Sequence, residues 1–291
     1  MIPRFSLARP HTLEEAWEAL ATAGGEGTYL AGGTELLQVM KMGLAQFGTL
    51  VDLKGIEELH GVAGTDGGSL RIGGAATHRE IERSAIVRER LPALARLEQH
   101  LANVRVRNQG TLGGNLCFAE PHSDPATFLL AAGAEVELAG PNGRRRLGIA
   151  DFVLGPLFTD REQDEVLVAI HVPAGRAGQG RGYAKIKFFE RPAASMAVSV
   201  EIADGAISGA TVVAGSLTEI PVTVPAASEA LVGLPASAVE EDGALAPARE
   251  ALGELDAVDD LNGSADYKRH LAGILLGRAL RDAFLEVPAR A

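Results

Sequence analysis

Two glycine pairs, each flanked by small polar residues, constrain the fold of this chain more than any other sequence feature. The first lies in Ala31-Gly32-Gly33-Thr34-Glu35-Leu36 and the second in Thr111-Leu112-Gly113-Gly114-Asn115. Glycine allows backbone conformations that other residues avoid and lets a second group approach the chain closely. The chain has 35 glycines, where about 20 would be average for its length. Because the pairs adjoin apolar runs, we expect them to form tight turns inside folded structure.

The first pair lies between a predicted strand over residues 28–31 and a predicted helix over residues 34–40. Such a turn directs free backbone N–H groups toward one point, which suits a phosphate or a diphosphate. Neither Gly-x-Gly-x-x-Gly nor the P-loop pattern occurs in this segment. A plain structural turn is therefore the simpler interpretation of this segment taken alone.

The second pair adds a hydroxyl and an amide side chain to further backbone donors. Two such segments, about 80 residues apart in the sequence, could hold a diphosphate from both sides without an arginine. The alternative is a second tight turn or bulge. Together the two segments make a bound dinucleotide as good a hypothesis as two structural turns.

Charge and cysteine content exclude several classes of protein. A formal net charge of −11 argues against a broad nucleic-acid surface. Cys117 is the one cysteine, so the chain can form no internal disulfide, cysteine-based zinc site or iron–sulfur cluster of its own. The first residues resemble no signal peptide, and no segment approaches the ~18 apolar residues of a membrane span. We expect a cytoplasmic protein without a transmembrane segment.

The length of 291 residues favours two domains. The best linker candidate is the proline- and glycine-rich stretch over residues 173–182. We predict a first domain over residues 1–176, in two parts of about 1–55 and 56–176. We predict a second α+β domain over residues 177–291.

Periodicity predicts the elements within these domains. Apolar residues at helical spacing predict helices over residues 13–20, 79–102 with a break at Pro92, 225–233, 245–254 and 266–286. Alternating or continuous apolar runs predict strands over residues 49–53, 70–72, 134–138, 144–147, 166–172, 183–189, 195–202 and 206–215. Thr12 and Glu15 have the spacing of a capping box for the first helix. Residues 107–115 are predicted as a glycine-rich loop.

At these motifs the chain resembles a known family, the FAD-binding (medium) subunits of molybdenum hydroxylases. The family includes the medium subunits of the aerobic carbon monoxide dehydrogenase group and the FAD domain of xanthine dehydrogenase. The resemblance covers almost the whole chain. Its matching segments are Leu13–Ala16, Leu30–Leu37, Met40-Lys41, Val106–Leu116, Pro121–Ala126, Ser264–Leu271 and Arg278–Leu280.

The resemblance implies an α+β fold. A two-part FAD-binding domain of the PCMH type, similar to vanillyl-alcohol oxidase, precedes a smaller α+β domain with a short antiparallel sheet and helices. The implied cofactor is FAD, with residues 31–36 against the pyrophosphate and residues 111–115 against the pyrophosphate and ribityl chain. The complete set of implied cofactor-binding residues is Leu30, Ala31, Gly32, Gly33, Thr34, Glu35, Leu36, Thr77, Thr111, Leu112, Gly113, Gly114, Asn115, Asp124 and Lys187. No catalytic residue and no metal ligand is implied in this chain.

Two departures from the family pattern stand out. Where the family often has Arg-x-x-x-Asp, this chain has Arg191-Pro192-Ala193-Ala194-Ser195, which puts the local packing in question. Asp160 and Arg161 occupy a position after Thr159 at which the family has an apolar flavin contact, so we carry over no contact there.

The implied function is electron transfer through FAD, from the iron–sulfur clusters of a partner subunit to an external acceptor. The implied partners are an iron–sulfur small subunit and a molybdopterin large subunit, in a dimer of heterotrimers. One alternative is a self-contained flavin oxidase, for which the sequence offers no convincing catalytic base. Another is a non-catalytic nucleotide-binding module, against which the two intact glycine segments argue.

Overall fold

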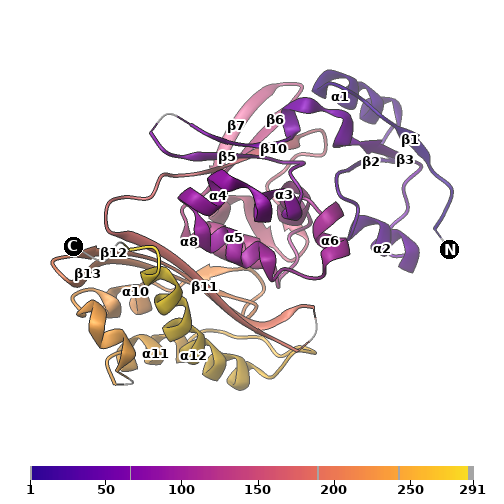
Figure 1. Cartoon of the computed structure of the whole chain (residues 1–291). Helices are drawn as coiled ribbons and strands as arrows, with labels where there is room; N and C mark the ends of the chain where they lie inside the picture. Colours follow the sequence, from indigo (N-terminus) through magenta and orange to yellow (C-terminus); the bar gives the residue numbers. More distant parts are fainter. Residues whose placement is uncertain (1, 66, 189, 242, 288–291) are drawn as a thin grey trace.

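Three sheets of three or more strands follow one another along the chain in the computed structural model (Figure 1). The structure describes residues 2–65, 67–188, 190–241 and 243–287. The N-terminal sheet lies at one end, a larger sheet with a layer of helices lies in the middle, and the C-terminal sheet lies at the other end (Figure 1). This α+β arrangement confirms the predicted fold class.

The N-terminal sheet is parallel, in the order β1-β3-β2. Its unit contains β1 (Ser6–Ala8), α1 (Leu13–Thr22), β2 (Gly27–Leu30), α2 (Leu36–Met42), β3 (Thr49–Asp52) and two short 3-10 helices, η1 (Leu53–Gly55) and η2 (Glu57–Leu59). Thr12 caps α1 as predicted, because its hydroxyl accepts the Glu15 N–H at 3.2 Å. The Glu15 carboxylate instead accepts the N–H of His11 at 2.7 Å, so the predicted box is not reciprocal.

The middle sheet is antiparallel, in the order β4-β5-β10-β6-β7. Its strands are β4 (Val62–Gly64), β5 (Leu70–Gly73), β6 (Glu135–Gly140), β7 (Gly143–Gly148) and β10 (Val166–Val172). The helices and small hairpin of this unit are α3 (His78–Arg83), α4 (Ala85–Arg90), α5 (Pro92–Gln99), α6 (Val104–Gln109), α7 (Leu112–Phe118), α8 (Asp124–Ala131), α9 (Ile149–Phe152), β8 (Val153–Gly155) and β9 (Phe158–Thr159). The largest apolar core lies between this sheet and its helices. The predicted strand over 166–172 and the break at Pro92 are confirmed, and Pro92 begins α5.

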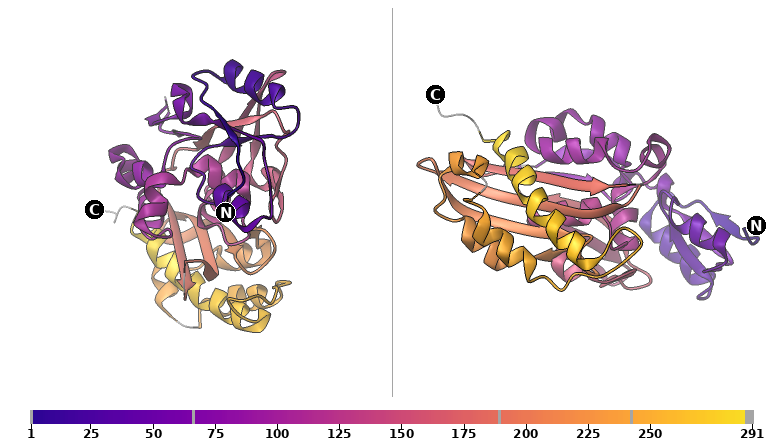
Figure 2. Two further views of the ribbon diagram at one scale, coloured as in Figure 1. Left: turned by 90° about the vertical axis from the view of Figure 1, so that its right-hand side faces the viewer. Right: turned by 90° about the horizontal axis from the view of Figure 1, so that it is seen from below.

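The C-terminal sheet is antiparallel, in the order β11-β12-β13-β14, and its long strands are covered by α12 (Figure 2). Its elements are β11 (Gln179–Lys187), β12 (Pro192–Ala203), β13 (Ala206–Gly215), β14 (Val222–Thr223), α10 (Pro225–Leu231), η3 (Ala236–Glu240), α11 (Ala246–Gly253) and α12 (Ala265–Phe284). The predicted strands and helices of this part are confirmed. Residue 189, the predicted end of the first of these strands, lies outside the described residues.

The predicted linker was wrong in its second half, because residues 179–182 belong to β11. The glycines there serve close packing. A Cβ on Gly182 would collide with the carbonyl oxygen of Ala279, and a Cβ on Gly180 would collide with that of Ala283. Glycine therefore lets α12 lie directly against β11, a packing role that is indistinguishable in sequence from flexibility.

The middle and C-terminal units share an interface. Helix α8 packs against β12 and β13, and Ala131 forms a small buried cluster with Ala197 and Val213. The domain boundary near residue 176 remains a prediction.

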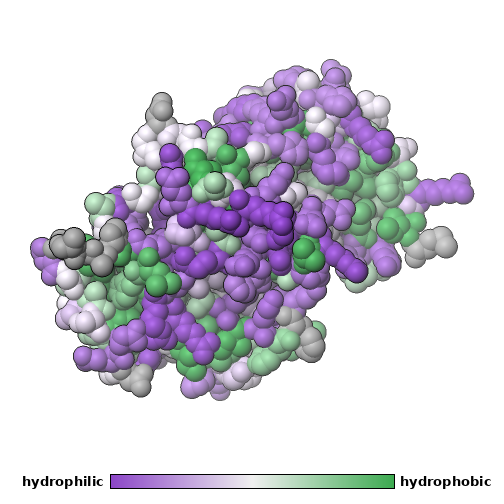
Figure 3. Space-filling model, in the orientation of Figure 1, coloured by the Kyte–Doolittle hydropathy of each residue, from purple (hydrophilic) through white to green (hydrophobic). Residues whose placement is uncertain are grey.

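Among the described residues, no helix is both long and apolar enough to cross a membrane. On the face shown in Figure 3, hydrophobic residues form separate small areas between broad hydrophilic ones.

Candidate functional site

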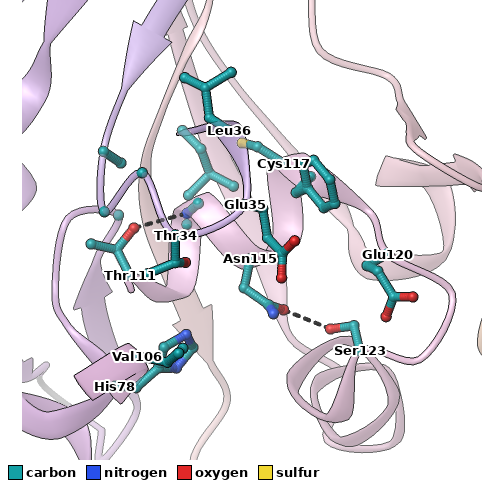
Figure 4. A pocket seen from close by; sticks show the side chains of 18 of the residues that line it. Thr34, Glu35, Leu36, His78, Val106, Thr111, Asn115, Cys117, Glu120 and Ser123 are labelled. Carbon is teal, nitrogen blue, oxygen red and sulfur yellow. Dashed lines mark hydrogen bonds between the residues drawn. The ribbon is translucent and has the colours of Figure 1, made fainter. Parts of the chain in front are cut away.

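A pocket with a volume of about 420 Å³ lies where the three units meet (Figure 4). Its walls come from residues 28–38, from α6 and α7 with the segment that follows them, and from residues 190–192 at the start of β12. Its size falls within the range of roughly 300–1,000 Å³ that is usual for cofactor pockets. Figure 4 shows Thr34, Thr111 and His78 along one side, with Glu120 and Ser123 on the opposite side.

The two glycine segments meet in this pocket. A Cβ on Gly32 would lie 2.7 Å from the Cα of Gly110 and 3.0 Å from the backbone nitrogen of Thr111. The second segment is held in turn against the residue that follows β5, since a Cβ on Gly113 would lie 2.5 Å from the carbonyl oxygen of Gly74. Gly32 and Gly113 are therefore needed for contact between backbones, while Gly33 adopts the left-handed conformation with φ of +70°.

The first segment offers a row of backbone donors. Residues 33–36 line the pocket, and within the described parts of the chain their N–H groups find no acceptor. The side chains of Ser123 and Asn115 also line the pocket, and the Ser123 hydroxyl donates to the Asn115 amide oxygen at 2.6 Å. Consecutive free N–H groups of this kind form a cradle for an anion.

The second glycine segment is more regular than predicted. Residues 104–109 form α6 and residues 112–118 form α7, so the loop is reduced to Gly110 and Thr111. Thr111 is the N-cap of α7, and its hydroxyl accepts the N–H of Gly114 at 3.1 Å.

Most of the predicted cofactor-binding residues line the pocket: Ala31, Gly32, Gly33, Thr34, Glu35, Leu36, Thr111, Gly113, Gly114, Asn115 and Asp124. The other four lie outside its lining. Leu30 and Leu112 are buried in apolar clusters. Thr77 caps α3 in a capping box with Glu80. Lys187 is exposed, and its Nζ donates to the carbonyl of His100 at 3.3 Å.

Lys185, two residues earlier on β11, makes the connection to the pocket that Lys187 does not. Its Nζ forms a buried ion pair with Asp124, and the hydroxyl of Tyr183 donates to the same carboxylate at 2.5 Å. The residue paired with Lys185 across the sheet is Ser195, which stands where the family often has an acid. The negative charge beside Lys185 therefore comes from Asp124 on α8 and not from its cross-strand neighbour Ser195.

Four of the carboxylates that line the pocket have a cation beside them. Arg191 lies 3.3 Å from Glu120 and 4.0 Å from Glu35, Lys185 pairs with Asp124, and Arg145 pairs with Glu165 at 2.7 Å. Because these charges are offset locally, the pocket can accept an anionic group although the chain as a whole is acidic.

Several lining residues were not among the predicted ones, notably His78, Cys117, Glu120, His122, Arg161 and Arg191. His122 falls within the matching segment Pro121–Ala126, but nothing in the sequence fixed the direction of its side chain or that of His78. Arg161, noted as a departure from the family, donates to the carbonyl oxygens of Glu162 and Glu165, each at 2.8 Å. It therefore closes the turn before β10. Burial raises the pKa of the Cys117 thiol to about 11, so this sulfur is a poor nucleophile near neutral pH.

An alternating row of charges joins the pocket wall to the C-terminal unit. His122 lies between Glu120, at 2.9 Å, and Asp260, at 2.8 Å. Asp260 also pairs with the fully buried Lys268 at 2.7 Å. Burial alone would lower the pKa of His122, but its hydrogen bonds and attraction to the two carboxylates raise it overall. Burial would raise the pKa of Asp260, yet Lys268 and His122 lower it to about 2.

We expect replacement of His122 by glutamine to make stability less dependent on pH. The raised pKa of His122 means that its charge stabilises the folded chain fully below its unfolded pKa of about 6.5, and less as pH rises through the folded value. The free energy of unfolding in urea should therefore be higher in wild type than in His122→Gln, and this gap should be larger near pH 5 than near pH 9 by on the order of 1 kcal/mol. A difference that grows with pH would contradict this assignment.

The described residues contain no group of three or more His, Cys, Asp or Glu side chains arranged to hold a metal ion.

Comparison with known proteins places these features in context. Residues 3–175 match the model of the FAD binding domain in molybdopterin dehydrogenase, and residues 189–283 match the CO dehydrogenase flavoprotein C-terminal domain. The carbon monoxide dehydrogenase medium chain of Hydrogenophaga pseudoflava is 34% identical over 284 residues, covering 97% of this chain and 98% of that one. The xanthine dehydrogenase FAD-binding subunit of Escherichia coli O157:H7 is 36% identical over 168 residues, 58% of this chain and 57% of that one.

The fold agrees as well. A solved structure of carbon monoxide dehydrogenase from Hydrogenophaga pseudoflava, which lacks the Mo-pyranopterin moiety of the molybdenum cofactor, superposes with a TM-score of 0.92 at 33% sequence identity. The superposition covers 99% of this chain and all of the matched chain.

Proposed function

This chain belongs to the family of FAD-binding subunits of molybdenum-containing dehydrogenases, and we propose that it is the electron-transfer subunit of a heterotrimeric molybdenum hydroxylase. The family membership makes it an oxidoreductase component whose cofactor is FAD. FAD, when bound, supplies the capacity to take electrons from iron–sulfur clusters and pass them to an external acceptor.

The residues of the pocket fit such a cofactor. The free N–H groups of residues 33–36 suit the diphosphate. An anion needs hydrogen-bond donors, and these backbone groups provide them without positively charged side chains. In the second segment, Asn115 lines the pocket next to Gly114, and the hydroxyl of Thr111 accepts the N–H of Gly114. This meeting of two glycine segments around a row of free donors is the observation that carries the proposal.

The chain's own residues would bind and orient the cofactor. The contact of Gly32 with the backbone of Gly110 and Thr111 fixes the spacing of the two segments. Asp124, held by Lys185 and Tyr183, would present a fixed carboxylate that can accept hydrogen bonds from ribityl hydroxyls. Lys187 stays a proposed contact near the flavin ring, although here it bonds to the carbonyl of His100.

The proposed partners are an iron–sulfur small subunit and a molybdopterin large subunit, with two such heterotrimers forming a dimer. The large subunit would carry the substrate site, because similar FAD subunits serve relatives named for carbon monoxide and for xanthine. We propose the cytoplasm as its location, since a single cysteine suits a reducing compartment.

Purification from the native cell tests this proposal. We expect a yellow chain that copurifies with two other subunits and releases FAD on acid treatment. A yellow chain that oxidises a substrate without partners would support a self-contained oxidase instead. A colourless chain that takes up no added FAD would refute the flavoprotein assignment.

A further inference from the structure

A buried histidine lies at the edge of the first glycine segment. His78 is the first residue of α3, it lines the pocket, and only 3% of its surface is exposed. The backbone N–H of His78 donates to the carbonyl of Gly110 at 3.1 Å. A Cβ on Gly110 would lie 3.2 Å from Cδ2 of His78 and 3.3 Å from Oγ1 of Thr34. The imidazole therefore lies beside Thr34, at the point where the two glycine segments meet (Figure 4).

A second buried side chain fixes the orientation of this ring. Glu98 on α5 is fully buried, and its Oε2 lies 2.8 Å from Nδ1 of His78. Within the described residues, the other carboxylate oxygen of Glu98 has no hydrogen-bond partner. We assign the donor role in this contact to Nδ1–H, with the Glu98 carboxylate oxygen as the acceptor. Nε2 is then the nitrogen left for another partner, and none of the described residues bonds to it.

The charges around this pair favour an anionic ligand. A carboxylate that is removed from water is costly unless a positive group compensates it, and His78 is the only group paired with Glu98 in the described structure. A ring protonated on both nitrogens would balance this charge and offer two N–H donors, one to Glu98 and one to a ligand in the pocket. The ring lies near Thr34, one of residues 33–36, whose free N–H groups suit a diphosphate.

We propose that His78 binds FAD directly, by donating Nε2–H to an oxygen of the diphosphate, and that Glu98 is a positioning residue that holds the ring in this orientation. This inference rests on the proposed function, because it assumes that FAD occupies the pocket.

Two amide variants of His78 separate binding from structure. In His78→Gln the longer side chain can place an N–H near the position of Nε2, whereas in His78→Asn the shorter one can reach only the position of Nδ1 and hence Glu98. If Nε2 binds the diphosphate, FAD affinity should stay within about threefold of wild type in His78→Gln. It should fall roughly 10- to 100-fold in His78→Asn, as expected for a hydrogen bond to a charged group.

Thermal unfolding of the FAD-free chain provides the independent readout. We expect His78→Asn to be at least as stable as His78→Gln, so that stability and FAD affinity rank the variants in opposite order. We expect Glu98→Gln to weaken FAD binding too, although Glu98 does not itself line the pocket and reaches it only through His78.

Equal affinities in the two His78 variants, or higher affinity in His78→Asn, would overturn the inference and leave the pair a structural one. A wild-type chain that binds no FAD would instead refute the proposed function, so the two failures are distinguishable.

Discussion

A Gly32→Ala chain is expected to lose most of its affinity for FAD. The added methyl group would meet the carbonyl oxygen of Gln109, the Cα of Gly110 and the nitrogen of Thr111, all of them backbone atoms. No side-chain rotation can relieve such contacts, so the two glycine segments must move apart. Overpacking of this kind costs about 1–3 kcal/mol, and we expect FAD affinity to fall roughly 10- to 100-fold. Titration of the FAD-free chain, followed by flavin fluorescence, measures this directly.

A matched control is Gly175→Ala, since a Cβ at that position would meet no heavy atom within 4 Å. Its FAD affinity should equal that of wild type. If Gly32→Ala also retains wild-type affinity, the close contact between the segments does not determine the spacing of the binding site, and the proposed role of the first segment fails.

Replacing Asp260 by asparagine is expected to destabilise the whole chain strongly. Lys268 is fully buried, and its amine is held by Asp260 at 2.7 Å and by the carbonyl of Ser216 at 3.1 Å. Removing the partner of a buried charge leaves that charge uncompensated, which typically costs about 3–5 kcal/mol. The free energy of unfolding in urea near pH 7 should fall by this amount.

The pH dependence should follow the lowered pKa of Asp260. Its carboxylate stabilises the folded chain fully above the unfolded pKa of about 3.9, and this contribution is lost as pH falls toward about 2. The difference in the free energy of unfolding between wild type and Asp260→Asn should therefore become smaller as the pH falls below about 4.

Two further variants sharpen the test of this ion pair. Adding Lys268→Met to Asp260→Asn removes the unpaired cation and should recover much of the lost stability. Asp256→Asn, an exposed neighbour in the same segment, should change the free energy of unfolding by no more than about 0.5 kcal/mol. A loss below about 1 kcal/mol in Asp260→Asn would mean that Lys268 has another source of compensation.

Local patterns in the sequence predicted most of the secondary structure and both glycine segments. The apolar run over residues 166–172 is strand β10. The predicted helix over residues 266–286 is α12, which ends at Phe284. These predictions succeed because helix and strand periodicity depends on neighbours within a few residues. The motifs around residues 31–36 and 106–116 were enough to indicate the family and its cofactor, as the comparisons confirm.

Tertiary structure decided which side chains act together. Lys185 and Asp124 are 61 residues apart in sequence, and His122 and Asp260 are 138 apart. The way α8 packs against the C-terminal sheet brings Asp124 to Lys185 and not to Lys187, and the docking of the C-terminal unit brings Asp260 to His122. Local periodicity cannot encode such pairs, because each depends on how separate sheets and helices pack. The glycines make the same point, since the sequence suggested approach to a ligand at Gly32 and flexibility at Gly182, while packing made both of them contacts between backbones.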